Sequence, residues 1–290
     1  MPFQLQQFLT LLWLLVLGKF TGYIYLSWSD IVLTLMVTTV LAHLFIYIHD
    51  KKVNFFSFSA LSTAIGVMLM MATQHLWILF VVIALGIGQK YLFKCEGKHL
   101  FNPSNFALII GLVLFYTQAH IVLGQLGEAL WLQIVVMLLA SAILLRVKRW
   151  LIPLVFTGSY LLLESMIVVA SDPLMIFEML LQRFYAVSFL LFIVFMLTDP
   201  VTTPSTWKRQ LVFATSIALM ATLLDYYVGF RVQHLFLSLF FNTFIFRLFE
   251  CVQNHFFTTT EKVKAVIALV LVLGAIIYIE FQVPYYFNMY

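Results

Sequence analysis

The sequence predicts an all-α polytopic membrane protein with ten to eleven transmembrane helices, some of them broken or half-length. The first observation is composition: 63% of the 290 residues are hydrophobic and only 10% are charged, whereas soluble domains carry about 25% charged residues. The second is a series of apolar runs, most of them about 20 residues long, which is the length that spans a hydrocarbon core. The third is the presence of polar interruptions within this apolar pattern.

Eleven apolar runs follow one another along the chain. Two of them are short, and one could lie at the membrane interface instead of spanning, which gives the count of ten to eleven. The runs lie near 8–28, 30–49, 57–73, 75–93, 102–117, 128–146, 150–171, 183–198, 210–227, 233–250 and 263–281. No linker or low-complexity segment divides them, so we expect residues 1–290 to form a single transmembrane domain.

The basic residues predict the orientation. If the runs alternate strictly, thirteen of the sixteen Lys and Arg residues fall on one side of the membrane, while Lys19, Arg183 and Arg231 do not. Because cytoplasmic loops are enriched in Lys and Arg, we expect a cytoplasmic N-terminus in a bacterial inner (cytoplasmic) membrane. The net charge of +4 is therefore an effect of topology. The basic residues are too dispersed to follow a nucleic-acid backbone.

The two cysteines, Cys95 and Cys251, both fall on the predicted cytoplasmic side. They form no CxxC pair or other metal-ligand spacing, and thiols stay reduced in that compartment. We expect incidental free thiols and no metal site.

The first polar interruption precedes a short apolar piece, in SFSALSTAIGVMLMMAT at 57–73. Its hydroxyl groups belong to Ser57, Ser59, Ser62 and Thr63. This pattern is typical of a half-helix whose N-terminal N–H groups face a polar ligand. Small residues that allow close helix packing would explain it equally well.

The second interruption is KCEGKHLFNPSNFALIIGL at 94–112. Pro103 suits the first turn of a helix, and Asn102 before it disfavours helical backbone. Asn102, Ser104 and Asn105 are thus expected around a helix N-terminus, where unpaired donors suit phosphate or carbonyl oxygens. A well-capped helix without a ligand is the alternative.

The third interruption is MLTDPVTTPST at 196–206, where Pro200 and Pro204 prevent the helix from continuing. Hydroxyl groups surround Asp199, contributed by Thr198, Thr202, Thr203, Ser205 and Thr206. An ordinary loop is the alternative here. Broken helices that gather polar groups in one place are how membrane proteins build small-ligand sites, so we expect the second and third interruptions to share a ligand.

Four segments resemble, in order, the signature segments of the NqrB/RnfD family of membrane subunits. They are SALSTAIGVMLM, GIGQKYLFKCEGKHLFNPSNFAL, MLTDPVTTPST and FLSLFFNTFIFRLFE, covering about 59–250. Members of this family belong to ion-pumping, flavin-dependent electron-transfer complexes. The chain is similar to a compact branch of the family, the membrane proteins of enediyne antibiotic gene clusters, which share the Asn-Pro-Ser-Asn and Thr-Asp-Pro stretches.

The resemblance implies a ten-helix fold with inverted repeats and a flavin inside the membrane domain. It carries over to Asn102, Pro103, Thr198, Asp199 and Pro200, and it adds a polar Asn in a later helix. In this chain that residue is Asn242.

One feature of the family is missing. Family members attach FMN to a threonine in a Ser-Gly-Ala-Thr segment, and no SGAT occurs here. We therefore expect a flavin, FMN or riboflavin, to bind non-covalently.

Ionisable residues inside spans are costly and by default face a partner or a cavity. Glu164, near the middle of the run at 150–171, is the leading proton or cation relay, and Lys19 could be its partner. The seven histidines show no pair at matched depth, which argues against a bis-histidine haem.

The leading hypothesis is a membrane-embedded, flavin-binding electron-transfer subunit that acts with partner redox proteins. No GxGxxG motif or cysteine cluster occurs, so the chain is at most a subunit of a membrane oxidoreductase. The alternative is a secondary transporter of flavin or another small flat metabolite on the same scaffold. A scaffold subunit without a ligand is a third hypothesis.

Overall fold

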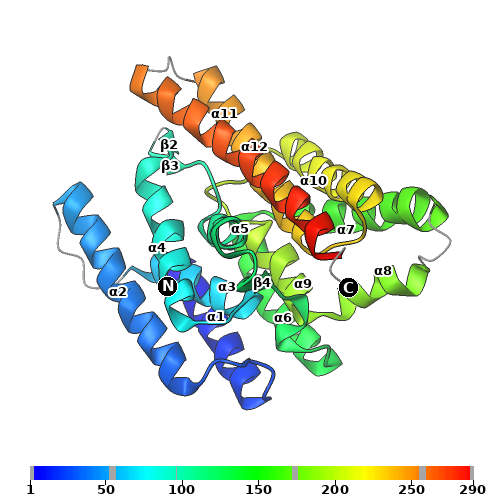
Figure 1. Cartoon of the computed structure of the whole chain (residues 1–290), viewed down its shortest axis with the longest axis horizontal. Helices are drawn as coiled ribbons and strands as arrows, with labels where there is room; N and C mark the ends of the chain where they lie inside the picture. The colour runs from blue at the N-terminus through cyan, green and yellow to red at the C-terminus, as the bar shows by residue number, and fades with distance from the viewer. Residues whose placement is uncertain (1–2, 52–56, 96, 172–175, 255–258, 288–290) are drawn as a thin grey trace.

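The computed structural model describes residues 3–51, 57–95, 97–171, 176–254 and 259–287 and shows a bundle of helices (Figure 1). Two small antiparallel strand pairs, β1 with β4 and β2 with β3, are its only sheet structure in these ranges. The long helices are α1 (Phe3–Phe20), α2 (Trp28–Asp50), α6 (Leu130–Val147), α7 (Leu151–Leu163) with its continuation η2 (Glu164–Val169), α10 (Trp207–Val228), α11 (Gln233–Asn254) and α12 (Thr259–Phe287).

Seven helices of the described residues are long and apolar enough to cross a membrane, and a bent pair raises the number to eight. An all-α polytopic fold is therefore confirmed, whereas the count of ten to eleven spans is not. The difference lies in the runs at 57–73, 75–93 and 102–117, which form the shorter apolar helices α3 (Phe58–Met70), α4 (Leu76–Leu92) and α5 (Pro103–Phe115). A 13-residue helix rises only about 20 Å, less than a hydrocarbon core of about 30 Å.

A short strand follows each of the helices α3 and α5 in the chain. β1 (Met71–Thr73) follows α3, and β4 (Ala119–Ile121) follows α5. The strands pair antiparallel, with Met71 opposite Ile121 and Thr73 opposite Ala119. The pairing satisfies backbone groups that apolar surroundings would otherwise leave without partners.

Two of the apolar runs that were predicted to be continuous helices are interrupted. The run at 150–171 changes from α-helix to the π-helical segment η2 at Glu164. The run at 183–198 is divided between α8 (Phe177–Tyr185) and α9 (Val187–Leu191), which continues into the π-helical segment η3 (Phe192–Met196). These two halves meet at a bend of 72°.

The core lies where α5 passes between α4 and α11, in the middle of Figure 1. Phe101, Phe240 and Phe244 are fully buried there, and the ring of Phe101 stacks on the other two with centroids 4.7 and 5.6 Å away. Close approach of α4 and α5 depends on Gly86, since an added Cβ would lie 2.8 Å from the carbonyl oxygen of Pro103.

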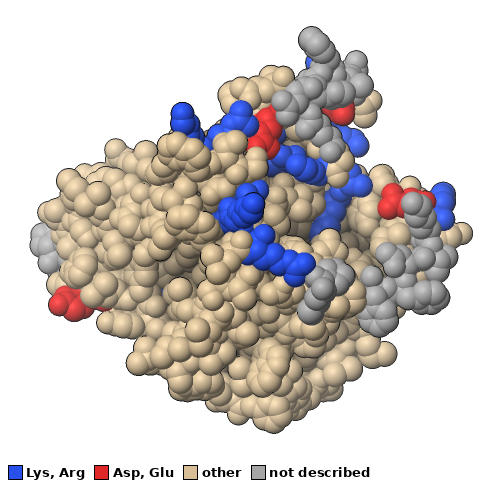
Figure 2. Space-filling view, turned by 180° about the vertical axis from the view of Figure 1, so that it is seen from behind, with Lys and Arg blue, Asp and Glu red and all other residues tan. Residues whose placement is uncertain are grey.

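The outer faces of the helices are apolar. Trp13, Met36 and Phe281, for example, are 60%, 62% and 76% exposed. An apolar surface of this extent is expected of a protein surrounded by lipid. Lys and Arg gather on the upper part of the face shown in Figure 2, and its lower part shows none. The chain is an integral membrane protein.

The expectation of two free thiols is wrong. Cys95 in β2 (Lys94–Cys95) forms a disulfide with Cys251 in α11, across 156 residues of sequence. The fold places the hairpin of β2 and β3 (Lys98–His99) against this end of α11. Because the cysteines are so far apart in the chain, their spacing could not reveal the pair.

Candidate ligand pocket

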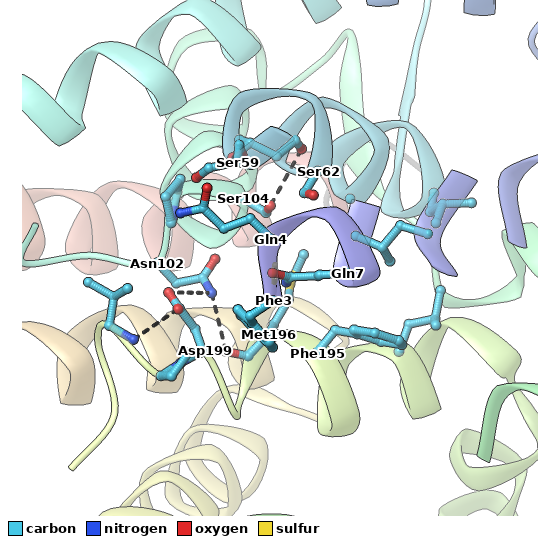
Figure 3. A pocket seen from close by; sticks show the side chains of 18 of the residues that line it. Phe3, Gln4, Gln7, Ser59, Ser62, Asn102, Ser104, Phe195, Met196 and Asp199 are labelled. Carbon is cyan, nitrogen blue, oxygen red and sulfur yellow. Dashed lines mark hydrogen bonds between the residues drawn. The ribbon is translucent and has the colours of Figure 1, made fainter. Parts of the chain in front are cut away.

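One pocket receives residues from all three polar interruptions (Figure 3). The second interruption follows the first by some 40 residues, and the third follows the second by some 95. All three nevertheless lie around one cavity of about 120 Å³. The lining from the interruptions consists of Ser59, Ser62 and Thr63 in α3, Asn102, Pro103 and Ser104 at the start of α5, and Asp199, Pro200 and Val201 after η3.

The N-terminal turn of α3 is held by a cap and by a lysine. The side chain of Ser57 accepts a hydrogen bond from the backbone N–H of Ala60. From α4, Lys90 Nζ donates to Ser59 Oγ at 3.0 Å and to Thr63 Oγ1 at 3.2 Å. The cationic side chain is thereby fixed beside the positive end of the α3 dipole.

Asn102 both caps α5 and ties it to the third interruption. Its Oδ1 accepts from the backbone N–H of Asn105 at 3.0 Å, with Pro103 following as the first helical residue. Its Nδ2 donates to the carbonyl oxygen of Met196 at 3.3 Å and to Asp199 Oδ2 at 3.4 Å. The N-termini of α3 and α5 therefore both face the pocket, a placement that favours negative charge.

Asp199 organises a turn around its own carboxylate. Oδ1 accepts from the backbone N–H of Val201 at 3.1 Å, and Oδ2 accepts from Thr202 Oγ1, also at 3.1 Å. Thr203 Oγ1 donates to the carbonyl oxygen of Asp199 at 2.7 Å and accepts from Arg149 Nε at 3.1 Å. The hydroxyls of Thr202 and Thr203 thus shape the turn, and Asp199 lines the pocket together with Pro200 and Val201.

Ser62 is the clearest unused polar group of the pocket. Its side chain is 6% exposed, and its Oγ has no hydrogen-bond partner among the described residues. A buried hydroxyl without a partner is unfavourable, and native proteins usually satisfy such groups with water or a ligand. Figure 3 shows it with Ser59 and Ser104 along one side of the cavity.

His99 lines the pocket as well, although no motif in the sequence indicated it. Its Nδ1 lies 2.8 Å from the carbonyl oxygen of Phe101, which can only accept, so Nδ1 carries the proton. Burial lowers the pKa of His99, although the nearby Asp199 acts in the opposite direction. The ring is therefore neutral near pH 7, and its Nε2 is an acceptor.

The opposite wall comes from the start of α1, which sequence reasoning also missed. Phe3, Gln4 and Gln7 line the pocket and lie in front of Asn102 and Ser104 in Figure 3. The three glutamines just before the first apolar run, Gln4, Gln6 and Gln7, were the available signal. Apolar walls are added by Leu69, Phe195 and Met196.

Other predicted site residues lie outside the pocket lining. Asn105 Nδ2 donates to the carbonyl oxygen of Phe236 at 3.0 Å and so joins α5 to α11. Thr198 Oγ1 donates to the carbonyl oxygen of Val194. Asn242 Oδ1 accepts a hydrogen bond from Ser216 Oγ at 2.8 Å, which joins α11 to α10. Its Nδ2 donates to the carbonyl oxygen of Ser238 in its own helix at 2.8 Å.

The proposed pairing of Lys19 with Glu164 does not form. Lys19 Nζ donates to the carbonyl oxygen of Ile24 at 3.3 Å, near its own end of α1. Glu164 instead lies beside Asp225 and Thr222 of α10. Lys19 and Glu164 are far apart in the sequence, and the apolar pattern alone could not show which spans are neighbours.

These features define a class of protein: a polytopic membrane protein with a polar pocket where three short or broken helices meet. The chain belongs to the NQR2, RnfD, RnfE family, whose model matches residues 114–258, half of the chain. The match includes the turn at Asp199 and lies after the first two interruptions. It identifies the chain as a membrane subunit of a redox complex. No curated protein matches the chain.

Proposed function

We propose that the chain binds a flavin non-covalently in this pocket and carries electrons as a membrane subunit of a redox complex. The observation that supports this most is the convergence of the three polar interruptions on one cavity, with the hydroxyl of Ser62 left unpartnered inside it. A bound flavin would supply the electron-accepting and electron-donating group, as cofactors commonly do in redox proteins.

The hydrogen-bonding groups that line the pocket fit the polar edge of an isoalloxazine ring. Ser62 can donate or accept, Asn102 presents an amide, and His99 and Asp199 are acceptors. Such an edge alternates carbonyl oxygens with ring N–H and N groups. Gly66 helps to keep the cavity open, because a Cβ at this position would meet Ser104 Oγ at 2.9 Å.

Size restricts how the ring could enter. The cavity of about 120 Å³ is smaller than ordinary ligand sites of about 300–1,000 Å³. We infer that the polar edge of the ring occupies the cavity and that the N-terminal turn of α1 moves outward to admit the rest. Phe3 and Gln4 belong to that turn.

The charges around the pocket would tune a bound flavin. Lys90 and the N-termini of α3 and α5 favour negative charge, and Asp199 opposes them. A positive surrounding stabilises the more negative, reduced form of a bound group and so raises its reduction potential.

The chain would need partner redox proteins to pass electrons on, and we infer a location in the bacterial inner membrane with the N-terminus in the cytoplasm. The concentration of Lys and Arg on one part of the surface supports this orientation. The disulfide between Cys95 and Cys251, on the side predicted to be cytoplasmic, is more typical of an oxidising compartment and argues against it.

Purification tests the proposal. The purified protein should show the visible absorption bands of oxidised flavin, either as isolated or after incubation with riboflavin or FMN. Acid precipitation should release the flavin into the supernatant, because no covalent bond holds it. A protein that shows no flavin after reconstitution would contradict the proposal, and flavin that stays with the precipitate would contradict the non-covalent attachment.

A further inference from the structure

A second group of polar side chains lies at the other end of α10 from the Asp199 turn. They come from five different helices and from the connection between α10 and α11. Its members are Tyr160, Glu164, Arg183, Asp225, Arg231, His234 and Glu280.

Asp225 is the centre of this group. Its Oδ2 accepts from Arg183 Nη1 at 2.9 Å and from the hydroxyl of Tyr160 at 3.3 Å. Its Oδ1 accepts from the backbone N–H of Arg231 at 2.9 Å and lies 2.5 Å from His234 Nδ1. The carboxylate is thus fully engaged on both oxygens although it lies inside the bundle.

Glu164 differs from Asp225, because none of the described residues donates a hydrogen bond to its carboxyl group. The side chain is 0% exposed, and neither carboxyl oxygen has a hydrogen-bond donor among the described residues. It lies beside Asp225 and Thr222, and the hydroxyl of Thr222 is equally buried and without a partner. An ionised carboxylate is very unfavourable in such a place. A neutral carboxylic acid carries no charge, so its burial costs far less.

The charges of the group require a bound proton. The guanidinium groups of Arg183 and Arg231 contribute two positive charges, and the carboxylates of Glu164, Asp225 and Glu280 contribute three negative ones. With His234 neutral, one negative charge stays uncompensated inside the bundle. One proton, on Glu164 or on His234, removes it.

A row of close contacts leads from the surface to Asp225, the neighbour of Glu164. Glu280 of α12 is 13% exposed, and its Oε2 lies 3.2 Å from His234 Nε2. The opposite nitrogen of the same ring contacts Asp225, which neighbours Glu164. Glu164 also begins the π-helical segment η2, a type of distortion that is frequent at functional sites.

We propose that Glu164 is a proton-binding site inside the membrane domain, loaded from the surface near Glu280 through His234 and Asp225. A proton that arrives at Glu280 passes to Nε2 of His234, and the proton on Nδ1 leaves to Oδ1 of Asp225. Asp225 then transfers a proton to Glu164, so that one O–H bond forms on Glu164 for each N–H bond broken at the ring. The site is separate from the pocket and does not depend on a flavin.

Infrared spectroscopy of the purified protein without added flavin tests this proposal. The C=O stretch of a buried protonated carboxyl group should be present near neutral pH, and Glu164→Gln should remove it. Glu178→Gln, which changes an exposed glutamate of α8, should leave the band unchanged. Because Gln has the size and charge of a protonated Glu, Glu164→Gln should also retain the wild-type melting temperature.

Isotope labelling keeps the test decisive if a variant fails to fold. In the wild-type protein, ¹³C-labelled glutamate should shift the band and ¹³C-labelled aspartate should not. The absence of a protonated carboxyl band, or a band that follows the aspartate label, would overturn the proposal. A band that disappears when sodium replaces choline at constant pH would also overturn it, since the carboxylate would then hold a cation.

Discussion

Ser62 shows how a single hydroxyl can indicate a ligand. The residue lies in the second turn of a helix and faces a cavity, yet its Oγ has no partner among the described residues. The sequence predicted Ser62 as a site residue from its place in a polar interruption. It could not distinguish Ser62 from Thr202, which bonds Asp199 instead, because both are hydroxyls beside a helix end.

Replacing Ser62 by Ala should weaken flavin binding without affecting the fold. The lost hydroxyl makes no described protein hydrogen bond, so only the ligand loses a contact, worth about 1 kcal/mol, or about fivefold in Kd. The measurement is a titration of purified protein with riboflavin, followed by quenching of flavin fluorescence. Ser238→Ala is the matched control, since its hydroxyl is also buried and unpartnered but lies outside the pocket lining. Equal effects of both substitutions would contradict the assignment.

Flavin binding should depend on pH through His99. Burial lowers the pKa of His99, so the folded protein prefers the neutral ring and the unfolded chain binds a proton first as the pH falls. Its contribution to stability is complete above the ordinary pKa of about 6.5 and is lost below it. Binding that uses Nε2 as an acceptor should weaken over the same range.

The measurement is the Kd for riboflavin at a series of pH values, in wild type and in His99→Gln. The variant should lose most of the weakening at low pH, and His120→Gln, at an exposed position of β4, should keep it. An unchanged pH profile in His99→Gln would exclude this role for the ring.

At the scale of elements, the short helices α3 and α5 are the features that build the pocket. The sequence indicated them, because each follows hydroxyl or amide residues and is too short to cross comfortably. It did not indicate the pairing of β1 with β4, since strands of three residues have no pattern of their own. The bend between α8 and α9 was equally hidden within an uninterrupted apolar run.

Gly86→Ala should destabilise the protein. The new methyl group would lie 2.8 Å from the carbonyl oxygen of Pro103 and 2.8 Å from the Cβ of Ala107, so α4 and α5 would have to separate. Overpacking of this kind costs about 1–3 kcal/mol. A thermal melt in detergent should show a lower transition temperature. Gly158→Ala on α7 is the control, because its Cβ would meet nothing within 4 Å. No difference between the two variants would mean that the helices are less tightly packed than described.

At the scale of the whole molecule, composition and the spacing of apolar runs were sufficient for the fold class. They could not show which helices are neighbours. Two features depend on contacts between distant spans: the disulfide between Cys95 and Cys251, and the proximity of Glu164 to Asp225. The family match covers half of the chain, and the pocket draws much of its lining from the other half.

A membrane subunit of a redox complex should not transport flavin by itself. Proteoliposomes that contain only this protein should take up no more riboflavin than empty liposomes, because the electron carrier works through its partners. Uptake that saturates with riboflavin concentration and is lost in Ser62→Leu would instead support the transporter hypothesis.

The most direct measurement of the central claim is an experimental structure of the protein with riboflavin added. We expect the ring between the N-termini of α3 and α5, with its polar edge next to Ser62, Asn102 and Asp199 and with the first turn of α1 displaced. Flavin bound at another place, with this pocket still closed by Phe3 and Gln4, would contradict the account.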